Sequence, residues 1–342
     1  MVTIKDVARD AGVSVGTVSN VLNGGRVSEA RRKLVEASIE KLGYQVNTLA
    51  KGMRMQKTDY VVVILPNLIN PYFALLLDAL ESELSAVGKQ VLLCLSGDDA
   101  EREVAFMDMA KQNKVDGIIG VTYSKVEEER IENMAFVSID RHYKSHIPCV
   151  AGDNWQGGWL AAENLHKRGS TNLLCFMTMS SVDSEVRKRR VGFTEYCMEH
   201  DLSCNSVEMS EKQIVSVYES YGSRKLIHNM LRAYISPSMG EHSIDGIFTS
   251  SDHLATIVRE ELEEMGKRVP EDIQIIGYDG LQFLNQGKPI VSSIAQPVHE
   301  IAKEAVRCLN ELIANGKTEG NTKIPVSFQE GLTTKTLVTE EK

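Results

Sequence analysis

From residue 60 onward the chain alternates apolar runs with amphipathic segments, and this alternation restricts the possible folds more than any other feature of the sequence. The run 60–65 is β-branched and apolar almost throughout, which predicts a strand buried on both faces. The segment 72–87 carries its apolar residues at helical spacing. Apolar strands interleaved with such helices indicate parallel sheets covered on both sides. About 280 residues of this pattern exceed one sheet, so we expect two α/β lobes, with ligands beyond the carboxyl ends of the strands.

The expected strands are 60–65, 90–95, 116–121, 135–139, 173–177, 245–249 and 273–277, with a further strand near Ile294. The expected helices are 72–87, 100–112, 155–167, 187–200, 222–234, 252–265 and 298–315.

The first two dozen residues differ from the rest and predict two short helices around a tight turn. Thr3 is a good N-cap with Asp6 three residues on, Gly12 is a natural stop, and Ser14 caps the second helix. A third helix over 28–42 would bury Leu34, Val35, Ile39 and Leu42. This layout lets one helix enter a DNA groove, although a plain helical hairpin would show the same pattern.

Charge is divided unevenly along the chain. Residues 1–58 contain ten lysines and arginines against five acidic residues, a net charge of +5. Because the whole chain carries −9, the remainder carries −14. A basic N-terminal segment followed by an acidic remainder concentrates affinity for phosphate at one end of the chain. The alternative is that the basic residues only form a solvated helix face.

The six cysteines are scattered and contain no Cys-x-x-Cys pair, which favours a reducing compartment. The N-terminus has no basic-then-apolar signal, and no apolar run approaches the length of a membrane span. We therefore expect a cytoplasmic protein without membrane association.

Several motifs along the chain occur in the order found in one family of regulators. They lie at 3–8, 13–19, 40–44, 70–73, 115–119, 138–141, 153–158, 269–273, 276–279 and 296–297. On these motifs the chain resembles the LacI–GalR family of bacterial transcription regulators, from Val2 to about Thr334. The resemblance implies homodimers on near-palindromic double-stranded DNA operators and a small effector between two lobes.

The implied fold is an all-α helix-turn-helix headpiece at 1–45 and a hinge helix within 46–59. These are joined to an α/β core at 60–342. That core is of periplasmic-binding-protein type, with two lobes built on two doubly wound parallel sheets.

On this resemblance the recognition helix begins near Ser14 and enters the major groove. Gly16 has no side chain and Val15 offers only methyl groups, so Asn20 is the hydrogen-bonding reader, with adenine its best match. The alternative is that Asn20 is a solvent-facing helix residue. The implied DNA-binding residues of the headpiece are Thr3, Ser14, Val15, Gly16, Thr17, Ser19, Asn20 and Arg26.

In the hinge, the family inserts an apolar side chain into the minor groove, and Met53 stands at that position. Leu is usual there, and Met is more flexible, so we expect a weaker or less selective kink. Alternatively, Met53 packs only against its mate in the dimer. Lys51 and Arg54 would neutralise phosphates, each adding roughly one unit to the salt slope.

The implied effector site combines carboxylates with a guanidinium, which suits a polyhydroxylated ligand. Its residues are Asn70, Tyr72, Phe73, Asp140, Arg141, Arg189, Ser251, Asp279 and Gln296. Asp140, Arg189 and Asp279 are the expected sugar contacts, whereas Phe73 and Tyr278 have core packing as an alternative. We expect Asp252 to cap its helix. The run 187–190 should be mostly solvated with Arg189 inward, and a phosphorylated sugar fits if two of its cations converge.

These features favour a DNA-binding repressor of a carbohydrate-utilisation operon, released by a sugar-like effector. One alternative is a corepressor-type regulator that responds to a nucleobase or a sugar phosphate. A transport-type sugar-binding protein is the rival from another class. Motifs of serine hydrolases, P-loop NTPases and zinc proteases are missing, so we expect no enzyme and no cofactor. His142 and His146 are four apart in a loop context, which argues against a metal site.

Overall fold

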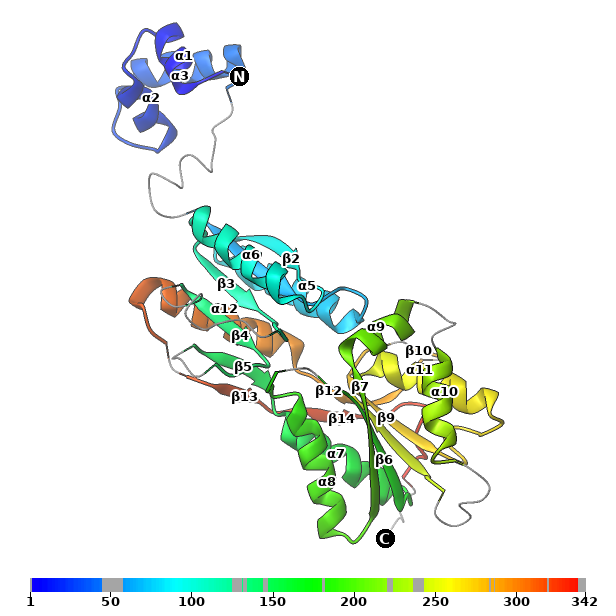
Figure 1. Ribbon diagram of the computed structural model, residues 1–342. Helices are drawn as coiled ribbons and strands as arrows, with labels where there is room; N and C mark the ends of the chain where they lie inside the picture. Colours follow the sequence, from blue (N-terminus) through cyan, green and yellow to red (C-terminus); the bar gives the residue numbers. More distant parts are fainter. Residues whose placement is uncertain are drawn as a thin grey trace. The chain divides into compact units, whose positions relative to one another are not determined.

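The computed structural model describes residues 2–44, 58–124, 131, 134–143, 147–179, 182–219, 224–235, 243–282, 284–285, 287–318 and 320–337. The chain separates into two compact units, Met1–Thr58 and Asp59–Lys342 (Figure 1). The hinge helix expected within 46–59 lies, apart from residues 58 and 59, outside the described residues. Among the described helices, none is long and apolar enough to cross a membrane.

The first unit contains α1 (Ile4–Asp10), α2 (Val15–Leu22) and α3 (Glu29–Leu42). Local side chains define the helix ends. The Asp6 carboxylate accepts hydrogen bonds from the Thr3 N–H at 2.9 Å and the Thr3 hydroxyl at 2.6 Å. The Ser14 hydroxyl oxygen accepts from the Thr17 N–H at 3.1 Å, which starts α2 as expected.

The core of this unit is small and consists of Val7, Ala8, Val18, Val21 and Val35. The expectation that Leu34 belongs to the apolar face of α3 is wrong, because its side chain is 54% exposed. Successive helical residues point about 100° apart, so Leu34 turns away when Val35 turns inward.

In the second unit, the first lobe is built on a six-stranded sheet of order β13-β5-β4-β3-β1-β2, parallel throughout. Its strands are β1 (Tyr60–Leu65), β2 (Gln90–Leu95), β3 (Gly117–Gly120), β4 (Phe136–Ile139), β5 (Cys149–Gly152) and β13 (Thr322–Ile324). Its helices are α5 (Pro71–Ala86), α6 (Ala100–Gln112) and α12 (Val298–Asn315).

Both faces of this sheet are covered, which explains the continuous apolar run of β1. Val61 and Val63 pack with α5 and α12, whereas Val62 and Ile64 face the opposite core with Met107 of α6. Alternate residues of a strand point to opposite faces, so a strand between two helical layers must be apolar at every position.

The second lobe contains a six-stranded sheet of order β14-β12-β9-β8-β6-β7. Its strands are β6 (Asn172–Met179), β7 (Ser203–Ser210), β8 (Gly246–Thr249), β9 (Gln274–Asp279), β12 (Ser292–Ala295) and β14 (Ser327–Gln329). Its helices are α7 (Asn154–Lys167), α8 (Arg187–Glu199), α9 (Glu211–Glu219), α10 (Lys225–Arg232) and α11 (Asp252–Glu264). A short hairpin joins β10 (Leu284–Asn285) to β11 (Lys288–Pro289).

The sheet of this lobe is parallel, as expected, except at one edge, where β14 pairs antiparallel to β12. An antiparallel edge on an otherwise parallel sheet is common in large α/β folds. It arises here because the chain enters β14 directly from β13 of the first lobe, without a crossover helix.

The chain crosses between the lobes three times, from β5 to α7, from β12 to α12 and from β13 to β14. These crossings contact one another. A Cβ built on Gly152 of the first would lie 3.2 Å from Val326 of the third and 3.3 Å from Gln296 of the second. The Gln156 amide oxygen also accepts a hydrogen bond from the Val326 N–H at 3.1 Å. The lobes are therefore joined through one compact group of connections.

Helices α7 and α8 lie side by side and approach each other through two glycines (Figure 1). A Cβ on Gly158 would lie 1.8 Å from the Arg189 carbonyl oxygen, and one on Gly192 would lie 2.0 Å from the Trp155 carbonyl oxygen. No side chain fits at either position, so the two backbones are in direct contact.

We expect Gly192→Ala to lower the free energy of unfolding, although alanine is intrinsically the better helix former by about 1 kcal/mol. The added methyl group would force α7 and α8 apart, and overpacking of this kind costs about 1–3 kcal/mol. Urea unfolding followed by tryptophan fluorescence measures the change. Gly320→Ala is the control, because a Cβ there has nothing within 4 Å. Equal stability of the two variants would contradict the account of the helix contact.

Candidate functional site

The outer face of α2 is the candidate nucleic-acid interface of the first unit. Val18 is buried in the core, whereas Val15, Gly16 and Asn20 are exposed. Among the other predicted DNA contacts, Thr17 and Ser19 are half-buried, and Thr3, Ser14 and Arg26 are exposed.

Gly16 is not required by the packing of the headpiece. A Cβ at this position would meet only the Ser14 hydroxyl oxygen, at 3.8 Å. The absence of a side chain at Gly16 therefore relieves no clash, and it leaves the helix backbone next to Asn20 exposed. The predicted hinge contacts Lys51, Met53 and Arg54 lie outside the described residues.

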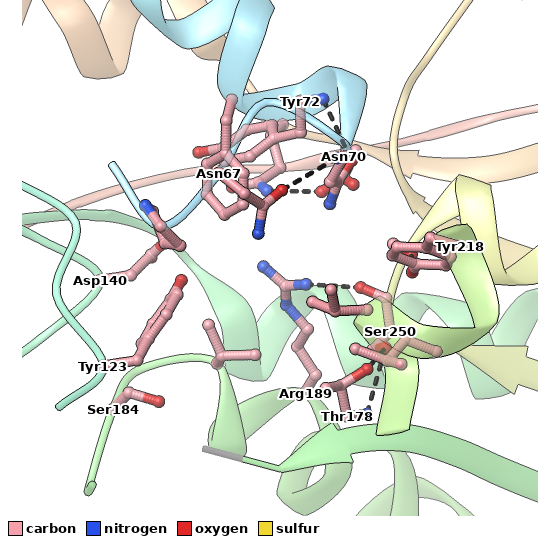
Figure 2. Close-up of a pocket in the computed structure, with 18 of the residues that line it drawn as sticks. Asn67, Asn70, Tyr72, Tyr123, Asp140, Thr178, Ser184, Arg189, Tyr218 and Ser250 are labelled. Carbon is pink, nitrogen blue, oxygen red and sulfur yellow. Dashed lines mark hydrogen bonds between the residues drawn. The ribbon is translucent and has the colours of Figure 1, made fainter. Parts of the chain in front are cut away.

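A cavity of about 760 Å³, open to solvent, lies between the two lobes of the second unit and is lined by both. Eight of the nine predicted effector residues line it, namely Asn70, Tyr72, Phe73, Asp140, Arg189, Ser251, Asp279 and Gln296. Figure 2 shows Arg189 in the middle of the cavity, with Asp140 and Tyr123 to one side and Tyr218 to the other.

Arg189 is only 4% exposed, and its guanidinium is held from several directions. Its Nε donates to Asn154 Oδ1 at 2.6 Å, and its Nη1 donates to the Ser250 carbonyl oxygen at 2.8 Å. The guanidinium carbon lies 3.5 Å from the ring centre of Tyr278, a cation–π contact. Burial opposes the charge, but Tyr278, Asp279 and Asp140 outweigh it and raise the pKa of Arg189. The cavity therefore contains a permanent cation.

Two carboxylates at strand ends accompany this cation. Asp140 follows β4 and Asp279 ends β9, and their backbones have φ values of 60° and 114°. Positive φ is unusual outside glycine and concentrates at functional positions. Asp140 Oδ1 accepts from the Asn154 amide at 3.2 Å, and Asp279 Oδ1 accepts from the Gln296 amide at 2.9 Å.

Burial raises the pKa of both carboxyls, and Arg189 opposes this effect in each. For Asp279 the result is a pKa of about 7.

Several buried polar atoms around the cavity have no hydrogen-bond partner within the described part of the chain. They include the Tyr72 hydroxyl, Asp279 Oδ2, Gln296 Oε1 and the Ser184 hydroxyl. An unpaired buried polar group costs about 1–3 kcal/mol, so these atoms are placed to bind water or a polar ligand.

Comparisons with known proteins agree on one family. Residues 3–47 match the model of bacterial regulatory proteins of the lacI family, and residues 162–334 match the periplasmic binding protein-like domain. A sucrose operon repressor of Pediococcus pentosaceus is 32% identical over 96% of this chain and 98% of its own. This chain belongs to the lacI family.

Two further relatives support the assignment of this LacI-family protein. A ribose operon repressor of Halalkalibacterium halodurans is 32% identical, covering 90% of this chain and 89% of its own. A periplasmic binding protein/LacI transcriptional regulator from Alkaliphilus metalliredigens, solved with D-xylulofuranose, has a TM-score of 0.69 and 25% identity. That comparison covers 81% of this chain and 100% of the other. The chain is a transcriptional regulator rather than an enzyme, and the predicted fold class is confirmed.

The expectation that Asp252 caps α11 in this LacI-family protein is wrong, because Ser251 is the cap. The Ser251 hydroxyl oxygen accepts from the Leu254 N–H at 3.1 Å. Asp252 is instead buried, and its Oδ2 accepts from the Leu281 N–H at 2.6 Å. Asp252 thereby holds the loop that follows Asp279.

Arg141 is the predicted effector residue that does not line the cavity. Its guanidinium donates to the Ser124 carbonyl oxygen at 2.6 Å and lies 4.4 Å from the ring centre of Tyr143. Arg189 of the run 187–190 is buried and Arg187 is exposed, as expected for a mostly solvated run, and Arg187 also borders the cavity. Tyr278 is fully buried beneath Arg189 and does not line the cavity.

Other lining residues were not predicted from the sequence. They are Pro66, Asn67, Tyr123, Thr178, Ser184, Val186, Arg187, Ile214, Val215, Tyr218 and Ser250. Thr178 and Ser250 stand at strand ends of the second sheet, a position that marks ligand contacts in α/β folds. Asn154 was missed because it lies behind the cavity and acts by joining Asp140 to Arg189. His146 lies outside the described residues, and no group of three metal-ligating side chains occurs among those described.

We expect Asp279→Asn to change how stability depends on pH. A buried acid with a raised pKa binds more protons in the folded than in the unfolded state, so it stabilises the fold at low pH. This contribution is complete below the ordinary pKa of 3.8 and disappears as the pH rises through about 7. The loss of stability between pH 4 and 7 should therefore be smaller in Asp279→Asn than in the wild type.

Urea unfolding at several pH values measures this difference. Exposed Asp183→Asn is the control and should retain the wild-type profile. Asp252, Asp140 and Arg189 are the ionisable neighbours of Asp279 and remain in the variant. If the free energy of unfolding changed with pH in the same way in the wild type and in Asp279→Asn, the raised pKa of Asp279 would be contradicted.

Proposed function

We propose that this LacI-family protein is a repressor of a carbohydrate-utilisation operon that binds a near-palindromic operator as a homodimer. It would act in the cytoplasm, where operator DNA is found. The exposed face of α2 supports the DNA-binding part, since Asn20 offers the amide that matches adenine in the major groove. The basic composition of residues 1–58 supplies attraction to phosphate.

We infer that the effector is a sugar that binds in the cavity between the lobes. The observation that carries this inference is the arrangement of Arg189 with Asp140 and Asp279 among buried, unpartnered polar atoms. Each carboxylate accepts two hydroxyl groups, and the guanidinium donates to others. Relatives named as sucrose and ribose operon repressors agree with a saccharide.

Coupling between the two sites would act through the angle between the lobes. The cavity is lined by both lobes, and the three crossings between them meet at Gly152 and Gln296. A sugar that binds one angle better shifts the population toward it. A coupling free energy of about 1–3 kcal/mol would change operator affinity roughly 5- to 150-fold.

A phosphorylated sugar is the second candidate effector, and one observation favours it. Arg187 lines the cavity in addition to Arg189, so a second cation borders the site. Arg187→Gln should weaken binding of a phosphorylated sugar selectively and leave a neutral sugar unaffected. Such a ligand, or a nucleobase, would also be compatible with a corepressor that strengthens operator binding.

We expect Asn20→Ala to lower the ratio of operator affinity to affinity for scrambled DNA, because it removes a bidentate contact to a base. Loss of such a contact costs about 1–3 kcal/mol, or roughly 5- to 150-fold in the ratio. Arg26→Gln removes a positive charge at a predicted DNA-binding residue, so it should instead weaken both affinities alike. Fluorescence anisotropy with the two DNA duplexes measures each affinity. If the ratio of operator affinity to affinity for scrambled DNA were unchanged in Asn20→Ala, Asn20 would not be the residue that recognises a base.

The sugar assignment is tested by thermal denaturation of the full chain with neutral sugars, sugar phosphates and nucleobases. A ligand at 100 times its dissociation constant adds about 2.7 kcal/mol to folded stability, seen as a rise of several degrees. The stabilising sugar should then release labelled operator DNA in an anisotropy assay. A response to nucleobases alone would refute the sugar effector while leaving the DNA-binding proposal intact.

A further inference from the structure

Three of the six cysteines lie in one apolar core of the second lobe, on the side of the sheet that α7 and α8 cover. Cys175 belongs to β6, Cys197 to the last turn of α8 and Cys204 to β7. Cys175 and Cys197 are at most 1% exposed, whereas Cys204 is half-buried on an edge strand. None of the three lines the cavity between the lobes, so this cluster is separate from the effector site.

Helix α8 and strand β7 bring Cys197 and Cys204 together. Arg190 of α8 forms an ion pair with Glu208 of β7, with 3.0 Å between Nη1 and Oε1. Cys197 follows Arg190 by two helical turns, about 10 Å along the axis, and lies on the same side of α8. Cys204 precedes Glu208 by four strand residues, about 13 Å, and points to the same face of the sheet. Because the chain reverses direction between the two elements, Cys197 lies opposite Cys204.

The contacts within the turn agree with this placement. The Leu202 N–H donates to the Cys197 carbonyl oxygen at 2.9 Å, and Asp201 has a φ of 51°. The Cys197 thiol donates a hydrogen bond to the Cys204 sulfur. The two sulfur atoms are therefore in direct contact.

This hydrogen bond makes the two thiols chemically unequal. It lowers the pKa of Cys204, because the donated proton stabilises the thiolate, and burial opposes this effect only partly. The same hydrogen bond raises the pKa of Cys197, and burial acts in the same direction. The thiolate is the form of cysteine that reacts with electrophiles. Cys204 is thus the nucleophile of the pair, and Cys197 is a protonated thiol beside it.

We propose that Cys197 and Cys204 are a modification site, a dithiol that hydrogen peroxide oxidises to an intramolecular disulfide. This inference does not rest on the proposed sugar effector or operator. The Cys204 thiolate attacks one peroxide oxygen, the O–O bond breaks, and hydroxide leaves, so that Cys204 becomes a sulfenic acid. The hydroxide combines with the proton that Cys204 gave up.

The second step forms the disulfide. The Cys197 sulfur attacks the Cys204 sulfur, the S–O bond breaks, and the departing hydroxide takes the Cys197 proton to form water. In total, two thiols and one hydrogen peroxide give one disulfide and two waters. The two electrons that the thiols lose are gained by the peroxide. A thiol reductant reverses the modification.

The first test is peptide mapping of the reduced full chain after treatment with hydrogen peroxide, with the remaining free thiols blocked by N-ethylmaleimide. No lysine or arginine lies within 191–211, so trypsin leaves both cysteines in the peptide 191–212. We expect this peptide to lose the mass of two hydrogen atoms. The number of thiols titrated in denaturant should fall from six to four. Cleavage after Glu199 should give two peptides that stay joined until they are reduced.

Three results of this mapping would overturn the proposal. They are the addition of oxygen to Cys204 without loss of hydrogen, a disulfide between Cys204 and Cys175, and an unmodified peptide 191–212 in oxidised protein.

The second test compares Cys197→Ala with its matched control Cys175→Ala, which removes the third thiol of the same core. Cys197→Ala removes the hydrogen-bond donor, so Cys204 should react several times more slowly with peroxide at neutral pH. Its product should stop at the sulfenic acid, which dimedone traps. Cys175→Ala should retain the rate and the disulfide of the wild type. Oxidation of Cys204 at the wild-type rate in Cys197→Ala would overturn the role of Cys197.

Thermal denaturation of each reduced variant reports whether it folds. If Cys197→Ala does not fold, Cys204→Ser at the half-buried position takes its place. Cys197 should then stay unmodified by peroxide, because its nucleophilic partner is gone. Oxidation of Cys197 in Cys204→Ser as fast as in the wild type would overturn the assignment of Cys204 as the nucleophile.

Discussion

The buried charge of Arg189 is the constraint on which the second unit depends. A guanidinium stays protonated in a protein, so a buried one needs hydrogen-bond acceptors and negative charges from the surrounding elements in place of water. Helix α7 supplies Asn154, the end of β8 supplies the Ser250 carbonyl oxygen, and β9 supplies the Tyr278 face. Carboxylates at the ends of β4 and β9 complete the compensation. Both lobes thus organise their strand ends around one side chain.

The position of that side chain is set by the contact between α7 and α8. Gly158 meets the backbone of Arg189 itself, and Gly192 meets the carbonyl of Trp155. Because the helices touch without side chains between them, Arg189 Nε lies 2.6 Å from Asn154 Oδ1 across the interface and donates a hydrogen bond to it. Asn154 then reaches Asp140 in the other lobe. The two glycines at the helix contact thus determine where the charged side chains that face the cavity lie.

The sequence predicted this fold well where periodicity and helix-end signals were strong. The run 298–315 and the helix stop at Gly43 agree with α12 and the end of α3. Strand β7 was missed because most of its residues are exposed at a sheet edge, which removes the apolar pattern. Within the cavity, Asp140 and Asp279 were predicted through the family resemblance, which places them after strands. Tyr218 was not predicted, because 33 residues separate it from its hydrogen-bond partner Ser251, and only the folded chain brings α9 onto α11.

The three crossings at Gly152 have a consequence for what the protein is able to sense. Because the three connections touch at one place, the angle between the lobes is the variable through which we propose that bound molecules act. Molecules that contact both lobes, inside the cavity or on the outer surface, would share this variable. Two such molecules cannot be independent inputs, since each alters the affinity for the other by the same factor. If the lobe angle sets operator affinity as proposed, the effects of two such molecules are combined in that angle before they reach the DNA.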